Sequence, residues 1–267
     1  MQTENKNLGK PQIAREILHV KEKFYLTPHY IRVVLEGNVE SYSIARIGDN
    51  NKIVLPNSEN QVVFPESEIE KKEVKIRTYT TRFIDFVNNT LTIDFVAHGD
   101  EGPASAWVIR ANVGDPLGVL MKYKPKPLFL PAENYLLVGD HTALPVVAAI
   151  LEQLPKDAKG KAILEVYSKE DVLELDKPEN VALDWIYNTE PGKISLLPNL
   201  VKKEKIEGDS NFVFVAVEYN SANEIQSFLR NHEKLNRSDW QTYAYWKYGQ
   251  AEDSSSSDRI KSMKKEE

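Results

Sequence analysis

The pattern of apolar residues changes once along this chain, near residue 131, and that change limits the folds open to it. Before this point, short apolar and β-branched runs predict six or seven strands and one short helix. The strand runs cover residues 13–23, 30–36, 52–55, 74–79, 82–87, 91–96 and 116–121, and the helix covers 104–111. The pair Asn88-Asn89 is a hairpin signal. Six or seven strands with one short helix favour an antiparallel barrel.

After residue 131, strands and helices alternate. Strands are expected at 135–139, 162–167, 183–187, 212–217 and 242–246, and helices at 143–154, 196–203 and 221–232. Such alternation predicts a parallel sheet, whose ligands lie beyond the carboxyl ends of the strands. Those ends fall at Gly139 to Thr142 and at Glu218 to Asn220. Ser221, with Glu224 three residues later, predicts a capping box for the last helix.

We therefore expect a two-domain β plus α/β chain. An antiparallel β-barrel at 11–131 precedes a Rossmann-like, parallel-sheet nucleotide-binding domain at 132–250, with a flexible leader at 1–10 and a flexible tail at 251–267. Lys122 to Pro131, with three prolines and three lysines, is the expected linker. The polar, acidic stretch 57–73 predicts a surface loop.

Composition excludes several functions. The chain has no cysteine, which rules out disulfides, thiolate metal sites and cysteine catalysis. Its five histidines show no metal-ligand spacing, so no metal site is expected. A net charge of -6 argues against a general nucleic-acid binder. The chain has no apolar run long enough to predict a membrane span, and it shows no signal peptide, so we expect a cytoplasmic protein. We also expect a monomer.

Two polar stretches predict a cofactor site. Arg77, Tyr79 and Thr80 end one predicted strand, and Gly102-Pro103 opens a helix near Ser105. A flavin ring could stack on Tyr79 with Thr80 hydrogen-bonded to its polar edge, while Arg77 and the helix N-terminus hold a pyrophosphate. Structural alternatives are an outward strand face, a simple turn capped by Ser105, and a packed or surface His98.

Four motifs extend this interpretation, because they occur in one order. They are Arg77 to Arg82 with Ile84-Asp85; His98-Gly99 with Gly102 to Ser105 and Trp107; Gly139 to Pro145; and Tyr245 to Gly249. Together they resemble the siderophore-interacting protein family, over residues 13–249. Members of that family are FAD-dependent ferric-siderophore reductases of the ferredoxin reductase superfamily.

The resemblance implies roles for individual residues. Tyr79 and Thr80 would be the catalytic pair, with Tyr79 against the flavin ring and Thr80 near its reactive nitrogen. The cofactor-binding set would be Arg77, Tyr79, Thr80, His98, Gly102, Ala104, Ser105, Asp140, Thr142 and Ala143, of which Thr142 and Ala143 should also receive a nicotinamide nucleotide. For Asp140, and for Glu218, the alternative role is that of a helix-start acid.

The same resemblance implies cations that face the iron chelate. Lys52 and Lys247 match such positions, although Lys247 stands where the family usually has arginine. An arginine of the turn after the barrel is absent, and Lys122, Lys124 or Lys126 would replace it; a solvated linker is the alternative. His141 stands where an acidic residue is common, and Val217-Glu218 departs from the family's pattern near the nucleotide site.

The implied function is FAD-dependent reduction of a ferric siderophore. Electrons would come from NADH or NADPH, or from a ferredoxin, and ferrous iron would be released. The alternatives are a general flavin or quinone reductase, and a non-catalytic flavin- or siderophore-binding protein. The altered Val217-Glu218 end motivates the non-catalytic alternative.

Overall fold

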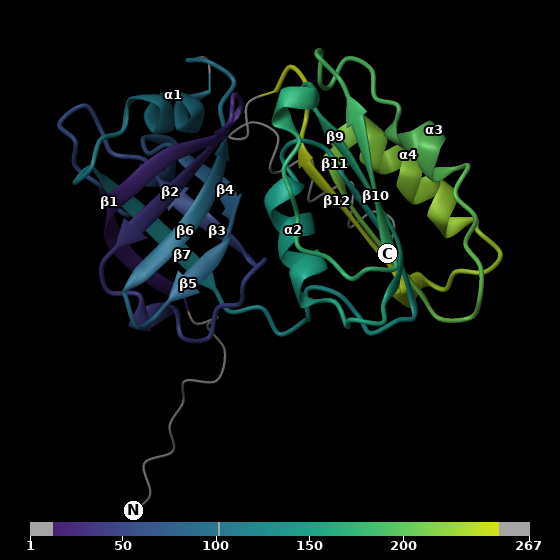
Figure 1. Cartoon of the computed structure of the whole chain (residues 1–267). Helices are drawn as coiled ribbons and strands as arrows, with labels where there is room; N and C mark the ends of the chain where they lie inside the picture. Colours follow the sequence, from purple (N-terminus) through teal and green to yellow (C-terminus); the bar gives the residue numbers. More distant parts are fainter. Residues whose placement is uncertain (1–12, 101, 251–267) are drawn as a thin grey trace, which may run out of the picture.

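The computed structural model describes residues 13–100 and 102–250, arranged as two sheets that lie side by side (Figure 1). The predicted leader at 1–10 and tail at 251–267 lie outside the described residues. No helix in the described part of the chain has both the length and the apolar character that crossing a membrane requires.

The first sheet is antiparallel throughout and forms a partly closed barrel. Its strands run in the order β4-β3-β7-β1-β2-β6-β5. They are β1 (Ile13–Thr27), β2 (Tyr30–Glu36), β3 (Asn50–Val54), β4 (Ile76–Thr80), β5 (Phe83–Asp85), β6 (Thr90–Val96) and β7 (Pro116–Lys122). Helix α1 (Pro103–Arg110) follows β6 and lies at one end of the barrel (Figure 1).

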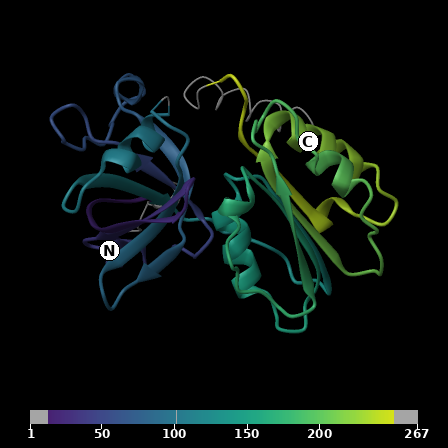
Figure 2. The ribbon, with the colours of Figure 1, turned by 45° about the horizontal axis from the view of Figure 1, so that its top comes forward.

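The second sheet is parallel, in the order β10-β9-β8-β11-β12. Its strands are β8 (Asn134–Gly139), β9 (Lys159–Val166), β10 (Val181–Tyr187), β11 (Asn211–Glu218) and β12 (Trp240–Trp246). Helices α3 (Leu197–Val201) and α4 (Tyr219–Arg230) cover its outer face, and α2 (Leu144–Gln153) lies between the sheet and the barrel (Figures 1 and 2). Short 3-10 turns lie at Glu40–Tyr42, Glu70–Lys72, Lys169–Asp171 and Arg237–Asp239.

The first eight residues of α2 are apolar on all sides, which suits this position between the domains. Every residue from Leu144 to Leu151 is buried, which is the pattern of a helix with no solvent face. Tyr30 of β2 is 1% exposed and packs in the same hydrophobic cluster as α2, although it belongs to the barrel. The two domains therefore share apolar surface on both sides of one helix.

The expected architecture is confirmed, with corrections at element ends. β1 continues to Thr27, four residues past its predicted end, because Lys23 to Thr27 pair with β2 through an irregular register. Asn89 takes a positive φ of 52° in the predicted hairpin turn. The stretch 57–73 is a loop that contains the 3-10 turn Glu70–Lys72.

The predicted capping box at Ser221 is wrong. Helix α4 starts two residues earlier, at Tyr219, and Glu218 is its N-cap. The Glu218 carboxylate accepts hydrogen bonds from the backbone N–H groups of Asn220, at 2.6 Å, and of Ser221, at 3.4 Å. Glu224 pairs instead with Lys202, at 2.6 Å. Strand β11 thus passes into α4 without an intervening loop.

Candidate functional site

The end of β4 carries the first group of predicted site residues. Arg77 pairs with the buried Ile53 across β3, so alternation places Arg77 and Tyr79 on the core-facing side of β4. The half-buried Tyr79 ring packs against Phe95 of β6, with centroids 4.4 Å apart. Thr80 is 6% exposed and belongs to the opposite face of the strand. The strand therefore groups Arg77 with Tyr79 and separates the side chain of Thr80 from them.

The loop before α1 carries the second group. The Ser105 hydroxyl accepts a hydrogen bond from the His98 backbone N–H at 2.9 Å and donates one to the Gly99 carbonyl oxygen at 2.7 Å. Gly102 leaves room for the His98 ring, since a Cβ at residue 102 would lie 2.3 Å from a ring carbon. The Ser105 side chain therefore shapes this loop from within.

The start of α1 is suited to an anion. In the described part of the loop, no side chain caps the first turn of the helix. Its backbone N–H groups, including those of Ala104 and Ser105, therefore keep the partial positive charge of a helix N-terminus. A pyrophosphate needs hydrogen-bond donors, and the backbone N–H groups of this helix start supply them. These residues fit the phosphate part of a dinucleotide such as FAD.

The turn between β8 and α2 carries the third group, and it is organised by Asp140. The buried Asp140 carboxylate accepts hydrogen bonds from the Thr142 backbone N–H at 2.9 Å, the Thr142 hydroxyl at 2.6 Å and the Trp246 indole N–H at 2.7 Å. Ala143 is fully buried and is the N-cap residue of α2. Asp140 therefore fixes the turn at one strand end and holds the last residue of β12 against it.

The second and third groups meet between the domains. Burial lowers the pKa of the His141 imidazole; Asp140 opposes this shift, while the charges of His98 and His29 add to it. The geometry agrees, because the Tyr30 hydroxyl donates to the His141 carbonyl oxygen at 2.6 Å, and the neighbouring His29 carbonyl oxygen accepts from the Ala97 backbone N–H, next to His98, at 2.8 Å. The face between the domains is therefore lined by both predicted cofactor loops.

Three of the four predicted chelate-facing lysines lie together at one barrel edge. Lys124 is half-buried and hydrogen-bonds Asn50, and Lys52 Nζ donates to the Thr78 hydroxyl at 2.7 Å. Burial lowers the pKa of Lys124, as do nearby Arg46, Lys52 and Lys122, while Asp49 opposes the shift. We call Lys52, Lys122 and Lys124 the barrel lysines. Their mutual repulsion makes this edge a place where an anion would be stabilised.

The fourth lysine belongs to the other domain. Lys247 follows β12, and its Nζ lies 4.7 Å from the centroid of the Tyr219 ring. Beside it, the Glu218 carboxylate accepts a hydrogen bond from the Tyr248 backbone N–H at 3.2 Å. Lys247 thus lies at the carboxyl edge of the parallel sheet, whereas the barrel lysines belong to the first domain.

Sequence reasoning missed Arg46. Its guanidinium binds Asp49 and donates to the carbonyl oxygens of Lys124 at 3.2 Å and Lys126 at 2.7 Å. Arg46 thereby fixes the linker segment that presents Lys124. An isolated arginine before a predicted strand offered no signal for this role, because its partners lie 78 and 80 residues away in the sequence.

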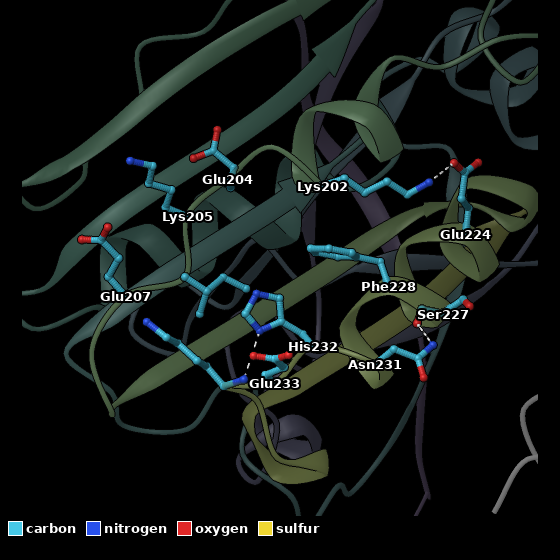
Figure 3. Close-up of a pocket in the computed structure, with 12 residues that line it drawn as sticks. Lys202, Glu204, Lys205, Glu207, Glu224, Ser227, Phe228, Asn231, His232 and Glu233 are labelled. Carbon is cyan, nitrogen blue, oxygen red and sulfur yellow. Dashed lines mark hydrogen bonds and ion pairs between the residues drawn. The ribbon is translucent and has the colours of Figure 1, made fainter.

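A groove of about 900 Å³ lies elsewhere, between the segment after α3 and the end of α4 (Figure 3). It flanks the amino end of β11, opposite the edge that carries Glu218. Its charges are mixed and partly paired, as Lys202 and Glu224 show. Asn231 donates to the Ser227 carbonyl oxygen at 2.8 Å. The groove therefore shows no charge preference, and it contains no predicted site residue.

The fold resembles that of a solved ferredoxin reductase. A ferredoxin NADP+ reductase from Neisseria gonorrhoeae with bound FAD and NADP superposes with a TM-score of 0.61 at 13% identity, covering 87% of this chain and 99% of that one. At this identity the likeness concerns the fold alone. The arrangement of an antiparallel sheet before a parallel one is a ferredoxin reductase-like fold.

More similar proteins narrow the class. Residues 19–122 match the model of the siderophore-interacting FAD-binding domain, and residues 132–249 match that of the siderophore-interacting protein. A ferric vibriobactin reductase, ViuB, from Vibrio cholerae is 30% identical over 91% of this chain and 93% of its own length. The siderophore-interacting protein SipS from Aeromonas hydrophila has a TM-score of 0.82 at 28% identity, covering 94% of this chain and 98% of that one. The chain belongs to the siderophore-interacting protein family.

Membership confirms the coarse part of the sequence-based interpretation. The match to an FAD-binding domain supports FAD as the cofactor, and the first three predicted residues of that site, Arg77, Tyr79 and Thr80, fall within the matched range. The FAD-binding domain match and the relatives named as ferric reductases together support a flavoprotein of the oxidoreductase class.

Proposed function

We propose that this protein is an FAD-dependent ferric-siderophore reductase that acts as a cytoplasmic monomer and releases ferrous iron. The barrel, residues 11–131, would bind FAD, and residues 132–250 would receive the electron donor, NADH, NADPH or a ferredoxin. The observation that carries this proposal is the hydrogen bond from Lys52 of β3 to Thr78 of β4, because β4 also carries Arg77 and Tyr79. A cationic edge for an anionic chelate thus adjoins the predicted flavin strand.

Each predicted cofactor residue has a distinct part in this proposal. Arg77 and the first turn of α1, at Ala104 and Ser105, would hold the pyrophosphate, and Tyr79, braced by Phe95, would pack against the ring. Gly102 and His98 shape the same loop. The turn formed by Asp140, Thr142 and Ala143 would face the far side of the cofactor and the donor. Thr80 would act from the strand end.

The reduction of the chelated iron requires no acid or base from the protein at the metal. Siderophores bind ferric iron through hard anionic oxygens, which hold ferrous iron less well, so one-electron reduction loosens the metal. Bound FAD supplies the link between a two-electron hydride donor and a one-electron acceptor. The barrel lysines and Lys247 would attract the anionic chelate, which raises association rates by roughly 10-fold at low salt.

One observation favours a second candidate, a non-catalytic flavin- or siderophore-binding protein that does not accept a nicotinamide. The two helix starts at the carboxyl edge of the sheet, those of α2 and α4, already lie beside carboxylates, Asp140 and Glu218. A negative group at each start opposes the binding of a nucleotide phosphate there. A reductase that takes its electrons from a ferredoxin would not need a nucleotide phosphate at these helix starts.

An anaerobic absorbance experiment tests the proposal. The purified protein should show flavin bands that NADH, NADPH or a reduced ferredoxin bleaches, and a ferric siderophore should restore them while a ferrous trap gains colour. Replacing Lys52 and Lys247 by alanine should weaken chelate affinity and leave the flavin content unchanged. Protein that cannot be reconstituted with FAD would overturn the proposal. Bleaching by ferredoxin alone would remove NAD(P)H as donor.

A further inference from the structure

The turn between β1 and β2 reaches from the barrel to the parallel-sheet domain, where it meets Asp171. The Thr27 hydroxyl donates to Asp171 Oδ1 at 2.8 Å, and the His29 backbone N–H donates to the same oxygen at 3.1 Å. His29 Nδ1 lies 2.9 Å from Oδ2 of Asp171. One carboxylate therefore binds three groups of a turn that precedes it by more than 140 residues.

Asp171 has no contact with solvent, since its exposed fraction is 0%. Within its own domain, the described residues supply one donor to this carboxylate, the Ser168 hydroxyl, at 3.4 Å. A buried carboxylate is stable only where donors satisfy it, and the closest donors here come from the barrel. Asp171 is therefore built for the docked arrangement of the two domains.

The same turn touches both predicted cofactor loops. The His29 carbonyl oxygen accepts a hydrogen bond from the Ala97 backbone N–H at 2.8 Å, next to His98. The Tyr30 hydroxyl donates to the His141 carbonyl oxygen at 2.6 Å, in the turn after β8. The His29 ring also stacks on Tyr167 at 4.4 Å. Held by Asp171, the turn thus connects the loop before α1 to the turn before α2.

We propose that Asp171 is a positioning residue that locks Thr27, His29 and Tyr30 to the parallel-sheet domain and thereby sets the spacing of the two cofactor loops. The assignment of those loops to a flavin site rests on the proposed function. The lock is a property of the chain itself and is tested without cofactor turnover.

Hydrogen exchange of the full chain, read by mass spectrometry, tests the lock. In the Asp171→Asn variant, the amides of Thr27, His29 and Tyr30 and those of residues 139–143 should exchange at least about tenfold faster, because the His29 donors lose a charged acceptor. The interiors of β7 and β9 should keep their protection, which shows that each sheet remains folded. Faster exchange confined to residues 168–172 would overturn the proposal.

Three further variants separate positioning from general stability. Glu165→Gln alters another buried carboxylate, whose partners Asn188 and Ser195 belong to its own domain, and should leave residues 27–30 protected. His29→Ala should deprotect both segments even if Asp171→Asn does not fold. His29→Asn, which retains a donor at the position of Nδ1, should restore most of the protection. Equal exchange in the alanine and asparagine variants would contradict the lock.

Discussion

At the scale of single residues, the charge of Lys124 is the most informative property of the barrel edge. The side chain lies among Arg46, Lys52 and Lys122, with Asp49 as the nearby acid, and it is half-buried. Burial and these cations both favour the neutral amine, so the pKa is lowered. An anion bound at this edge would favour the charged form again. Chelate binding and the protonation of Lys124 should therefore be coupled.

This coupling predicts a pH dependence. Lys124 carries its charge below its lowered pKa, so affinity for an anionic ferric chelate should fall as pH rises through that pKa, below the ~10.4 of an ordinary lysine. Titrating the chelate from about pH 7 to pH 10 measures this, and Lys124→Met should flatten the profile. The exposed Lys126 provides a control, because Arg46 binds its carbonyl oxygen, which Lys126→Met retains. Identical profiles for Lys124→Met and the unaltered protein would contradict the coupling.

At the scale of elements, the start of α4 shows how a strand and a helix share one residue. Glu218 ends β11 and caps α4, and it also binds the Tyr248 backbone N–H after β12. Three elements thus depend on one carboxylate. Ser221, by contrast, offers its backbone N–H to that carboxylate.

A pair of substitutions distinguishes these roles. Glu218→Ala should lower the free energy of unfolding by about 1–2 kcal/mol, the cost of a lost N-cap. Ser221→Ala, which keeps the backbone N–H, should change it by less than about 0.5 kcal/mol. Urea unfolding followed by circular dichroism measures both. If Ser221→Ala cost as much as Glu218→Ala, the hydroxyl of Ser221 would be the cap after all.

The elements themselves could be predicted because their signals are local. Alternation and helical periodicity located both sheets and α1, α2, α3 and α4, and the order of four motifs indicated the family. The start of α4 was mispredicted because Ser221 and Glu224 fit a capping box, whereas the burial of β11 through Glu218 decides where the helix begins. Asp171 and Arg46 were missed because their partners are distant in sequence. Only the folded chain brings Asp171 to His29.

At the scale of the whole molecule, α2 is fixed between the domains at both ends. Its start follows the turn that Tyr30 contacts, and near its end Glu152 forms a two-pronged ion pair with Arg82. Arg82 is 5% exposed and also lies 3.9 Å from Asp94, which binds Arg32. The barrel thus contacts the second domain at two separate points along the helix, which favours one arrangement of the domains.

Weakening both points should separate the unfolding of the domains. Glu152→Gln should lower the free energy of unfolding by about 1–2 kcal/mol, because Arg82 loses a charged partner but keeps Asp94. Calorimetry of the unaltered protein should show one transition, and Asp171→Asn combined with Glu152→Gln should show two. Glu190→Gln, which breaks an exposed pair with Lys193, is the control and should leave the free energy of unfolding nearly unchanged. A single transition in the double variant would mean that the apolar contacts of α2 alone couple the domains.

The burial of Tyr30 also has a consequence for how the chain acquires its structure. Tyr30 is made early in synthesis, but the cluster that buries it includes Leu137, Val147 and Phe214, which follow more than 100 residues later. Contacts of such sequence separation form slowly, because a long loop must close first. Until then, the newly made barrel presents an apolar tyrosine and the donors of its first turn to water. Completion of the barrel's surface therefore waits for the last strands of the second sheet, and refolding should be limited by docking.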